Sequence, residues 1–116
     1  MYKVEHWRRQ ELALLLDELV LTLRSGKNPE WAGVFAHFGH ELALLGSARA
    51  VDERQLQRLI GCIELCLEPG SGFSRLILES SDSQEVTPLN LRFSRLRAVL
   101  AKALEGMRGR LVEFVN

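Results

Sequence analysis

The sequence predicts an all-α fold, a bundle of about four main helices in a single domain over residues 1–116. Three observations predict it: leucine dominates the apolar residues, apolar residues recur every three or four positions, and helix-capping residues bound the resulting segments. Leucine loses little rotamer freedom in a helix, and this periodicity produces one apolar helical face. A chain of 116 residues has the length of about one ordinary domain.

The first helix is predicted over residues 3–25. Its apolar face comprises Leu12, Leu15, Leu16, Leu19 and Leu23. Gly26 follows the last periodic residue, and we expect it to adopt the left-handed conformation that ends many helices.

A second apolar line runs along the opposite side of this helix and consists of Trp7, Leu14 and Leu21, spaced seven residues apart. A helix that is apolar on two opposed faces is not a plain surface helix. Either it is the centre of the bundle, which the sequence favours, or the second line is a seam that contacts another chain.

The second helix is predicted over residues 29–45. Asn28-Pro29-Glu30 supplies a capping side chain, a proline at the first helical position and an acid near the positive end of the helix dipole. Its expected core face comprises Trp31, Val34, Phe35, Phe38, Leu42 and Leu45, and Gly46 closes it.

The third helix is predicted over residues 53–67. Asp52 with Gln55 forms a capping-box pattern, and Val51 with Leu56 is placed as a hydrophobic staple. The core stripe comprises Leu56, Leu59, Ile60, Ile63 and Leu67.

The segment 70–79 is glycine-rich at its start and fits either a turn into a short helix or an extended stretch; a polar loop follows over 80–86. Thr87-Pro88 repeats the cap-then-proline signal, which predicts a last helix over 88–107. Its apolar face comprises Leu89, Phe93, Leu96, Leu100, Leu104 and Met107.

The overall charge is zero, from 15 basic and 15 acidic residues, so no global field indicates a nucleic acid or a membrane as partner. No apolar run approaches the ~20 residues that span a bilayer, and the first residues lack the order of a signal peptide. With Cys62 and Cys66 as the only cysteines, we expect reduced thiols in a cytoplasmic protein.

The charge is nevertheless uneven along the chain. Residues 52–87 hold three basic and seven acidic side chains, whereas residues 88–116 hold six basic and two acidic ones. We expect the two segments to lie together and neutralise each other; the alternative is an acidic patch for a basic partner, or the reverse.

Candidate metal ligands are His37 and His40, with Glu41 beside them, and the pair Cys62 and Cys66. The histidines are not in an HExxH arrangement, and they fall away from the aromatic face of their helix. The cysteines need two further ligands to hold zinc. We therefore expect rim histidines and packed cysteines, with no metal and no other cofactor.

Other chemistry is equally weakly indicated. The chain has no nucleophile-elbow motif, and Gly70-Ser71-Gly72 lacks the lysine of a phosphate-binding loop, so a backbone bend explains its glycines and an enzyme is not expected. Arg92, Arg95 and Lys102 cluster on the last helix, but in a neutral chain a solvated face explains them better than nucleic-acid binding.

Several short motifs resemble a family of small bacterial proteins of unknown function. They are Asn28-Pro29-Glu30-Trp31, the box from Gly70 to Leu78, and Asn90-Leu91-Arg92-Phe93. In that family the box reads closer to Gly-Gly-Met-Gly-Ser-Phe-Asn-Asp-Leu; here the methionine is missing and Ser74-Arg75 replaces the Asn-Asp pair. Its members look like the helical immunity proteins encoded beside bacterial toxins, which implies a non-catalytic inhibitor.

The acidic stretch 64–85 is where we expect such a partner to bind, because a binding surface needs an anchor and complementary charge. The expected contact residues are Glu68, Phe73, Arg75, Glu79 and Asp82, with Phe73 as the aromatic anchor. The alternatives are a homodimer built on the seam of Trp7, Leu14 and Leu21, and a small metalloprotein or enzyme that uses His37, His40, Cys62 and Cys66.

Overall fold

The structure, a computed structural model, describes residues 4–47 and 53–115, and these residues form helices and no strand. The helices are α1 (His6–Ser25), α2 (Pro29–Ser47), α3 (Glu53–Leu67) and α4 (Ser83–Val115). The all-α prediction is thus confirmed.

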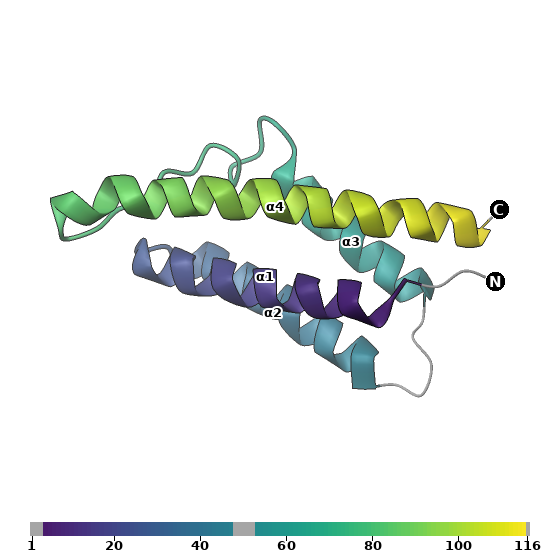
Figure 1. Ribbon diagram of the computed structural model, residues 1–116. Helices are drawn as coiled ribbons and strands as arrows, with labels where there is room; N and C mark the ends of the chain where they lie inside the picture. Colours follow the sequence, from purple (N-terminus) through teal and green to yellow (C-terminus); the bar gives the residue numbers. More distant parts are fainter. Residues whose placement is uncertain (1–3, 48–52, 116) are drawn as a thin grey trace.

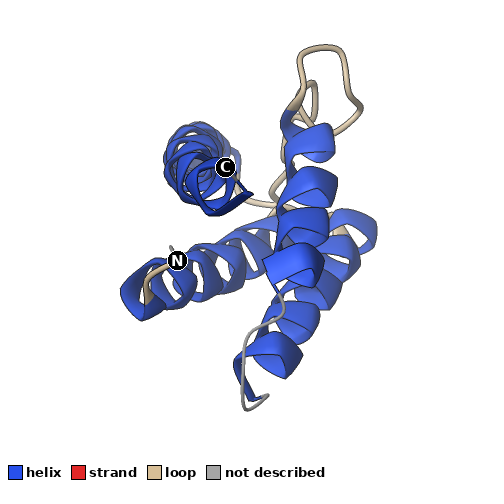
Figure 2. Cartoon of the chain, turned by 90° about the vertical axis from the view of Figure 1, so that its right-hand side faces the viewer, coloured by secondary structure: helices blue, strands red, loops and turns tan. Residues whose placement is uncertain are grey.

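The helices form two layers. Helices α1 and α4 lie side by side and antiparallel, so that the start of α1 is next to the end of α4 (Figure 1). Seen along α4, these two helices occupy one side of the molecule, and α2 and α3 occupy the other (Figure 2). Residues 68–82, here called the strap, connect α3 to α4 without regular secondary structure.

The core faces predicted for α1, α3 and α4 are largely confirmed. All six residues expected on α4 are buried, as are Leu56, Leu59, Ile60 and Ile63 on α3. On α1, Leu15 is only partly buried, whereas the other four residues of its face are fully buried. On α2 the predicted core face is wrong at one position. Val34 is 38% exposed, and Ala32 is buried in the core instead.

The first helix also starts later than expected, whereas the second and third start where they were predicted. The first helix begins at His6, three residues late, and Glu5 precedes it in an extended conformation. The second begins at Pro29 as predicted, with the Oδ1 atom of Asn28 accepting a hydrogen bond from the backbone N–H of Trp31 at 3.2 Å. The third runs from Glu53 to Leu67 as predicted, but its expected cap and staple, Asp52 and Val51, lie outside the described residues.

The last helix begins at Ser83, five residues before the predicted start. Asp82 caps it, since its Oδ1 atom accepts a hydrogen bond from the backbone N–H of Gln84 at 2.9 Å. Pro88 therefore lies inside α4, where its missing N–H leaves the carbonyl of Gln84 without a helical donor. Gln84 is exposed, so water can satisfy that carbonyl and the helix continues.

The end of α1 corrects a further prediction. Lys27, with a φ of 57°, adopts the left-handed conformation, whereas Gly26 has a φ of −89°. Gly26 is needed for a different reason: a Cβ atom there would lie 2.7 Å from the Cβ of Leu78. The strap thus packs directly onto the backbone at the end of α1.

No helix in the described part of the chain is both long enough and apolar enough to span a bilayer.

Replacing Gly26 by alanine tests this packing. We expect Gly26→Ala to lower the free energy of unfolding by about 2 kcal/mol, in the range for inserting a methyl group into a close-packed site. Gly33→Ala on α2 is the matched control, because a Cβ there meets nothing within 4 Å; it should stabilise the protein by ~0.5–1 kcal/mol. Urea denaturation followed by circular dichroism measures both, and equal effects of the two substitutions would contradict the packing described.

Candidate partner-binding surface

Phe73, the expected surface anchor, is instead at the centre of the core. It is fully buried, and its ring centroid lies 4.7 Å from that of Phe35, 5.0 Å from that of Trp31 and 5.3 Å from that of Phe93. The prediction of a surface role for Phe73 is therefore wrong. The strap had to supply the apolar group that fills the space between α2 and α4, since aromatic rings in contact bury large areas.

The first turn of the strap is closed by serine side chains. The hydroxyl of Ser71 donates to the carbonyl of Cys66 at 2.6 Å and accepts from the backbone N–H of Ser74 at 3.1 Å. Gly70 adopts a φ of 92°, a conformation that favours glycine, and so forms the predicted backbone bend. This turn places Phe73 over the core.

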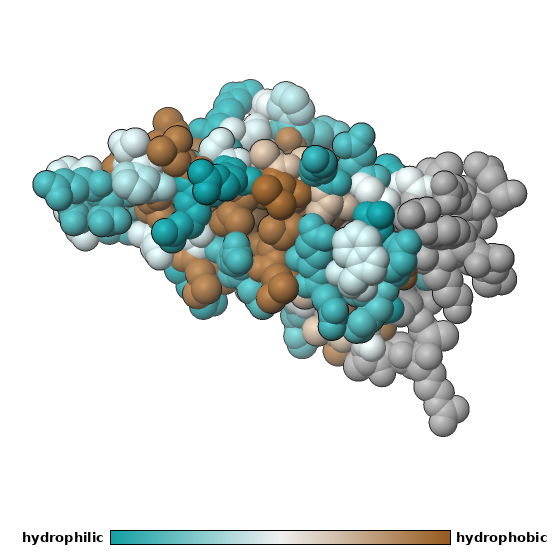
Figure 3. Space-filling model, in the orientation of Figure 1, coloured by the Kyte–Doolittle hydropathy of each residue, from teal (hydrophilic) through white to brown (hydrophobic). Residues whose placement is uncertain are grey.

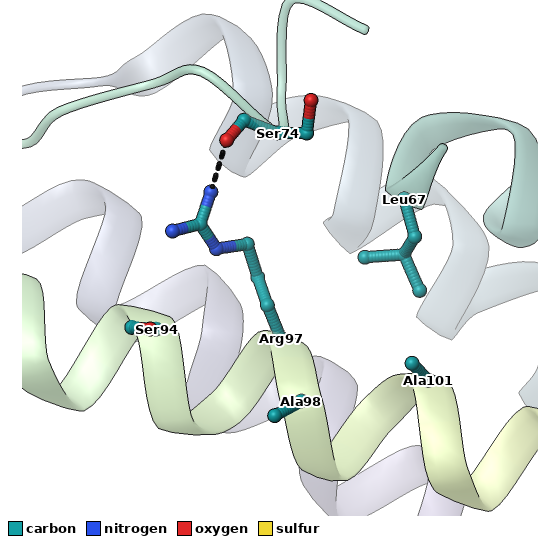
Figure 4. A pocket seen from close by; sticks show the side chains of 6 residues that line it. All are labelled: Leu67, Ser74, Ser94, Arg97, Ala98 and Ala101. Atoms are coloured by element: carbon teal, nitrogen blue, oxygen red, sulfur yellow. Dashed lines mark hydrogen bonds between the residues drawn. The ribbon is translucent and has the colours of Figure 1, made fainter. Parts of the chain in front are cut away.

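Arg97 of α4 fixes the middle of the strap. Its Nη1 atom donates to the carbonyls of Phe73 and Ser74, at 3.2 and 2.9 Å, and its guanidinium stacks over the ring of Phe93 at 4.2 Å. Figure 4 shows the side chain reaching from α4 to the strap, beside a hollow of about 270 Å³ over Ala98 and Ala101. Burial lowers the pKa of Arg97. Its guanidinium lies against carbonyl oxygens and an aromatic face, both of which attract a cation.

Asn90 fixes the far end of the strap. Its Oδ1 atom accepts from the backbone N–H of Leu78 at 2.8 Å, while Nδ2 donates to the carbonyls of Leu78 at 3.0 Å and Val86 at 2.9 Å. The backbone N–H of Glu79 donates to the carbonyl of Gly26 at 3.3 Å. Asn90 therefore takes the place of a neighbouring β-strand and holds the strap extended.

With Phe73 and Leu78 facing inward, the strap exposes the other residues expected at the interface. Glu68, Arg75, Glu79 and Asp82 are all exposed. The structure adds two apolar residues that the sequence analysis missed: Ile77 is 75% exposed and Leu91 is 63% exposed, and both line a hollow of about 370 Å³ between the strap and α4. This hollow, rather than Phe73, is the apolar feature that the strap and α4 present at the surface.

The seam of Trp7, Leu14 and Leu21 is also exposed, at 54%, 65% and 63%. The favoured interpretation, that α1 is the centre of the bundle with both faces covered, is therefore wrong: α1 contacts α2 and α4 with one side only. Figure 3 views the opposite side and shows apolar groups along α1 and between α1 and α4. The seam interpretation remains a prediction.

The expected neutralisation between the acidic and basic segments is seen at one place among the described residues. Arg108 of α4 forms a two-pronged ion pair with Glu64 of α3, and this hydrogen-bonded partner raises the pKa of Arg108. Arg97, by contrast, contacts carbonyls instead of carboxylates.

The candidate metal ligands are not assembled into a site. His37 is exposed, and its Nε2 atom lies 2.8 Å from Oε1 of Glu41 one turn further along α2. Cys62 and Cys66 are free thiols on α3. Within residues 4–47 and 53–115, no three or more His, Cys, Asp and Glu side chains are grouped so as to hold a metal ion.

Comparison of this chain with known protein families, with curated proteins and with solved structures finds no match.

Asn90→Asp tests the attachment of the strap. A carboxylate can accept from the N–H of Leu78 but cannot donate to the two carbonyls, so we expect a loss of about 2–3 kcal/mol in the free energy of unfolding. Hydrogen exchange should show faster exchange of the Leu78 and Glu79 amides. Ser94→Ala on the same helix, an exposed site, is the control; unchanged exchange in Asn90→Asp would show that the strap is held by other contacts.

The two thiols should differ in reactivity. Burial, and secondly Cys62, raises the pKa of Cys66, so at a given pH below that pKa a smaller fraction of Cys66 is thiolate. Cys62 is exposed. We expect iodoacetamide to alkylate Cys62 first near pH 8, as mass spectrometry of peptides can show; urea should abolish the difference, and preferential labelling of Cys66 in the folded protein would refute it.

Proposed function

We propose that this chain is a non-catalytic protein-binding module that contacts its partner through the outer face of the strap. The observation that carries the proposal is the exposed apolar pair Ile77 and Leu91, which lines one hollow between the strap and α4. Burying such a pair against a partner removes apolar surface from water and so stabilises the complex.

The rigidity of the strap supports this function. Phe73 and Leu78 anchor it from below, while Arg97 and Asn90 bind its backbone directly. A surface segment held in one conformation loses little conformational entropy when it binds, and this raises its affinity for a partner.

The charges of the strap suggest the chemistry of the partner. Glu68, Glu79 and Asp82 outnumber Arg75 among the exposed strap residues, so the strap attracts a basic surface. An immunity protein that covers the nucleic-acid-binding site of a bacterial toxin would meet such a surface. The resemblance of the sequence motifs to immunity-like proteins favours this role within the wider class of binding modules.

The direct experiment is to co-express the chain with the product of the gene beside its own in the source genome, and to measure both survival of the host and the Kd of the purified pair. We expect rescue of growth and a Kd that Ile77→Asp weakens by about 100-fold, as for an anchor residue.

Leu65→Asp is the matched control, because Leu65, at 63%, is exposed much as Ile77 is, at 75%, but lies on α3 outside the lining of the hollow. It should bind as the natural chain does. Unchanged binding by Ile77→Asp, in a protein whose circular dichroism is normal, would exclude the strap as the binding surface.

A further inference from the structure

The exposed face formed by α1 and α4 carries charges of opposite sign on its two helices. On α1, Glu11, Asp17 and Glu18 are exposed and flank the seam of Trp7, Leu14 and Leu21. On α4, Arg92, Arg95 and Lys102 are exposed, with Val99 at 41% among them. None of these six charged side chains forms an ion pair with another described residue.

The register between the two helices follows from one contact. A Cβ atom on Gly106 would lie 2.6 Å from Nη1 of Arg8, so the two positions are level to within the reach of an arginine side chain. Because α1 and α4 are antiparallel (Figure 1) and each rises by about 1.5 Å per residue, a step forward along α1 matches a step back along α4. Glu11 is therefore roughly level with Ala103, and Glu18 with Leu96.

We infer that a second copy of this chain covers this face, with α1 of each copy packed on α4 of the other. A twofold axis parallel to the helices produces this arrangement and keeps every residue at its own level. Glu11 then lies over Lys102 of the second copy, Leu14 over Val99, and Glu18 over Arg95. The same contacts form twice, as in any twofold interface.

Charge selects this arrangement over the other twofold packing of the same face. An axis across the helices would place α1 against α1 and α4 against α4. Acids would then face acids and bases would face bases, which costs free energy at each contact. In the parallel-axis dimer, acidic and apolar residues on α1 meet basic and apolar residues on α4 in the same order.

At the aromatic end of the seam, the guanidinium of Arg8 stacks over the ring of Trp7 at 4.5 Å and also lies against Gly106 of α4 in the same chain. The face formed by α1 and α4 differs from the strap hollow, and the dimer does not depend on the proposed function.

The test uses two charge reversals, Glu18→Arg and Arg95→Glu, studied by sedimentation equilibrium from ~1 μM to ~1 mM, the range that separates strong from weak association. The natural chain should form a dimer in this range. Each variant alone should dimerise at least about tenfold more weakly, since the repulsive contact occurs twice.

An equimolar mixture of the two variants should recover the dimer. In the mixed dimer the introduced arginine faces the introduced glutamate, and the native Arg95 of one copy faces the native Glu18 of the other. Both contacts are then attractive, an outcome specific to α1-on-α4 packing.

Leu14→Asp should abolish dimerisation, and Leu65→Asp, at an equally exposed leucine, should leave it unchanged. Thermal unfolding should be similar for all four variants at a concentration where the natural chain is monomeric, which separates association from folding. A natural chain that stays monomeric to ~1 mM, or a mixture that dimerises no better than its components, would overturn the inference.

Discussion

The seating of Phe73 between α2 and α4 is the contact on which the rest of the structure depends. Within the described residues those two helices have no close backbone contact, and the rings of Trp31, Phe35 and Phe93 meet around Phe73 instead. A residue of the strap thereby acts as part of the core. Because Phe73 cannot leave without opening a large cavity, it attaches the strap to the helices, although the strap has no regular hydrogen-bond ladder of its own.

This seating determines what the strap exposes. Phe73 faces inward from a turn, and Leu78 faces inward further along the strap, so its neighbour Ile77 faces outward. Asn90 and Arg97 satisfy carbonyls that a helix or sheet would otherwise bind. Buried polar backbone needs such partners. The polar side chains of α4 thus have a structural role at the strap, and the acidic side chains of the strap remain available to solvent.

The sequence was sufficient to predict the elements that depend on local periodicity. It was insufficient where tertiary contacts determine which residues are buried. The heptad-like faces of α1, α3 and α4 predicted their buried leucines, and Asn28 predicted the start of α2. The start of α4 was wrongly predicted from Thr87-Pro88. Asp82 caps the helix further upstream, and α4 tolerates Pro88 because the turn before it is exposed. The surface role predicted for Phe73 was wrong because an aromatic residue in a polar loop has the same local sequence pattern whether it binds a partner or fills the core. Only the rings of α2 and α4, distant in sequence, distinguish the two cases. Ile77 had a signal, the three apolar residues from Leu76 to Leu78, since an extended segment on a core buries only one of its sides.

The two surfaces also constrain each other. A twofold axis parallel to α1 and α4 leaves both straps at the same end of the dimer, because it preserves position along the helices, and rotates them to opposite sides. The hollow of Ile77 and Leu91 lies between the strap and α4, whereas the proposed second copy would contact α4 on its α1 side. A single small partner therefore cannot cover both straps, and each copy in the dimer presents its own. Binding of one partner per chain, with the straps acting independently, is the stoichiometry that this geometry requires, and a partner that is itself twofold would link dimers into larger assemblies instead of closing on one of them.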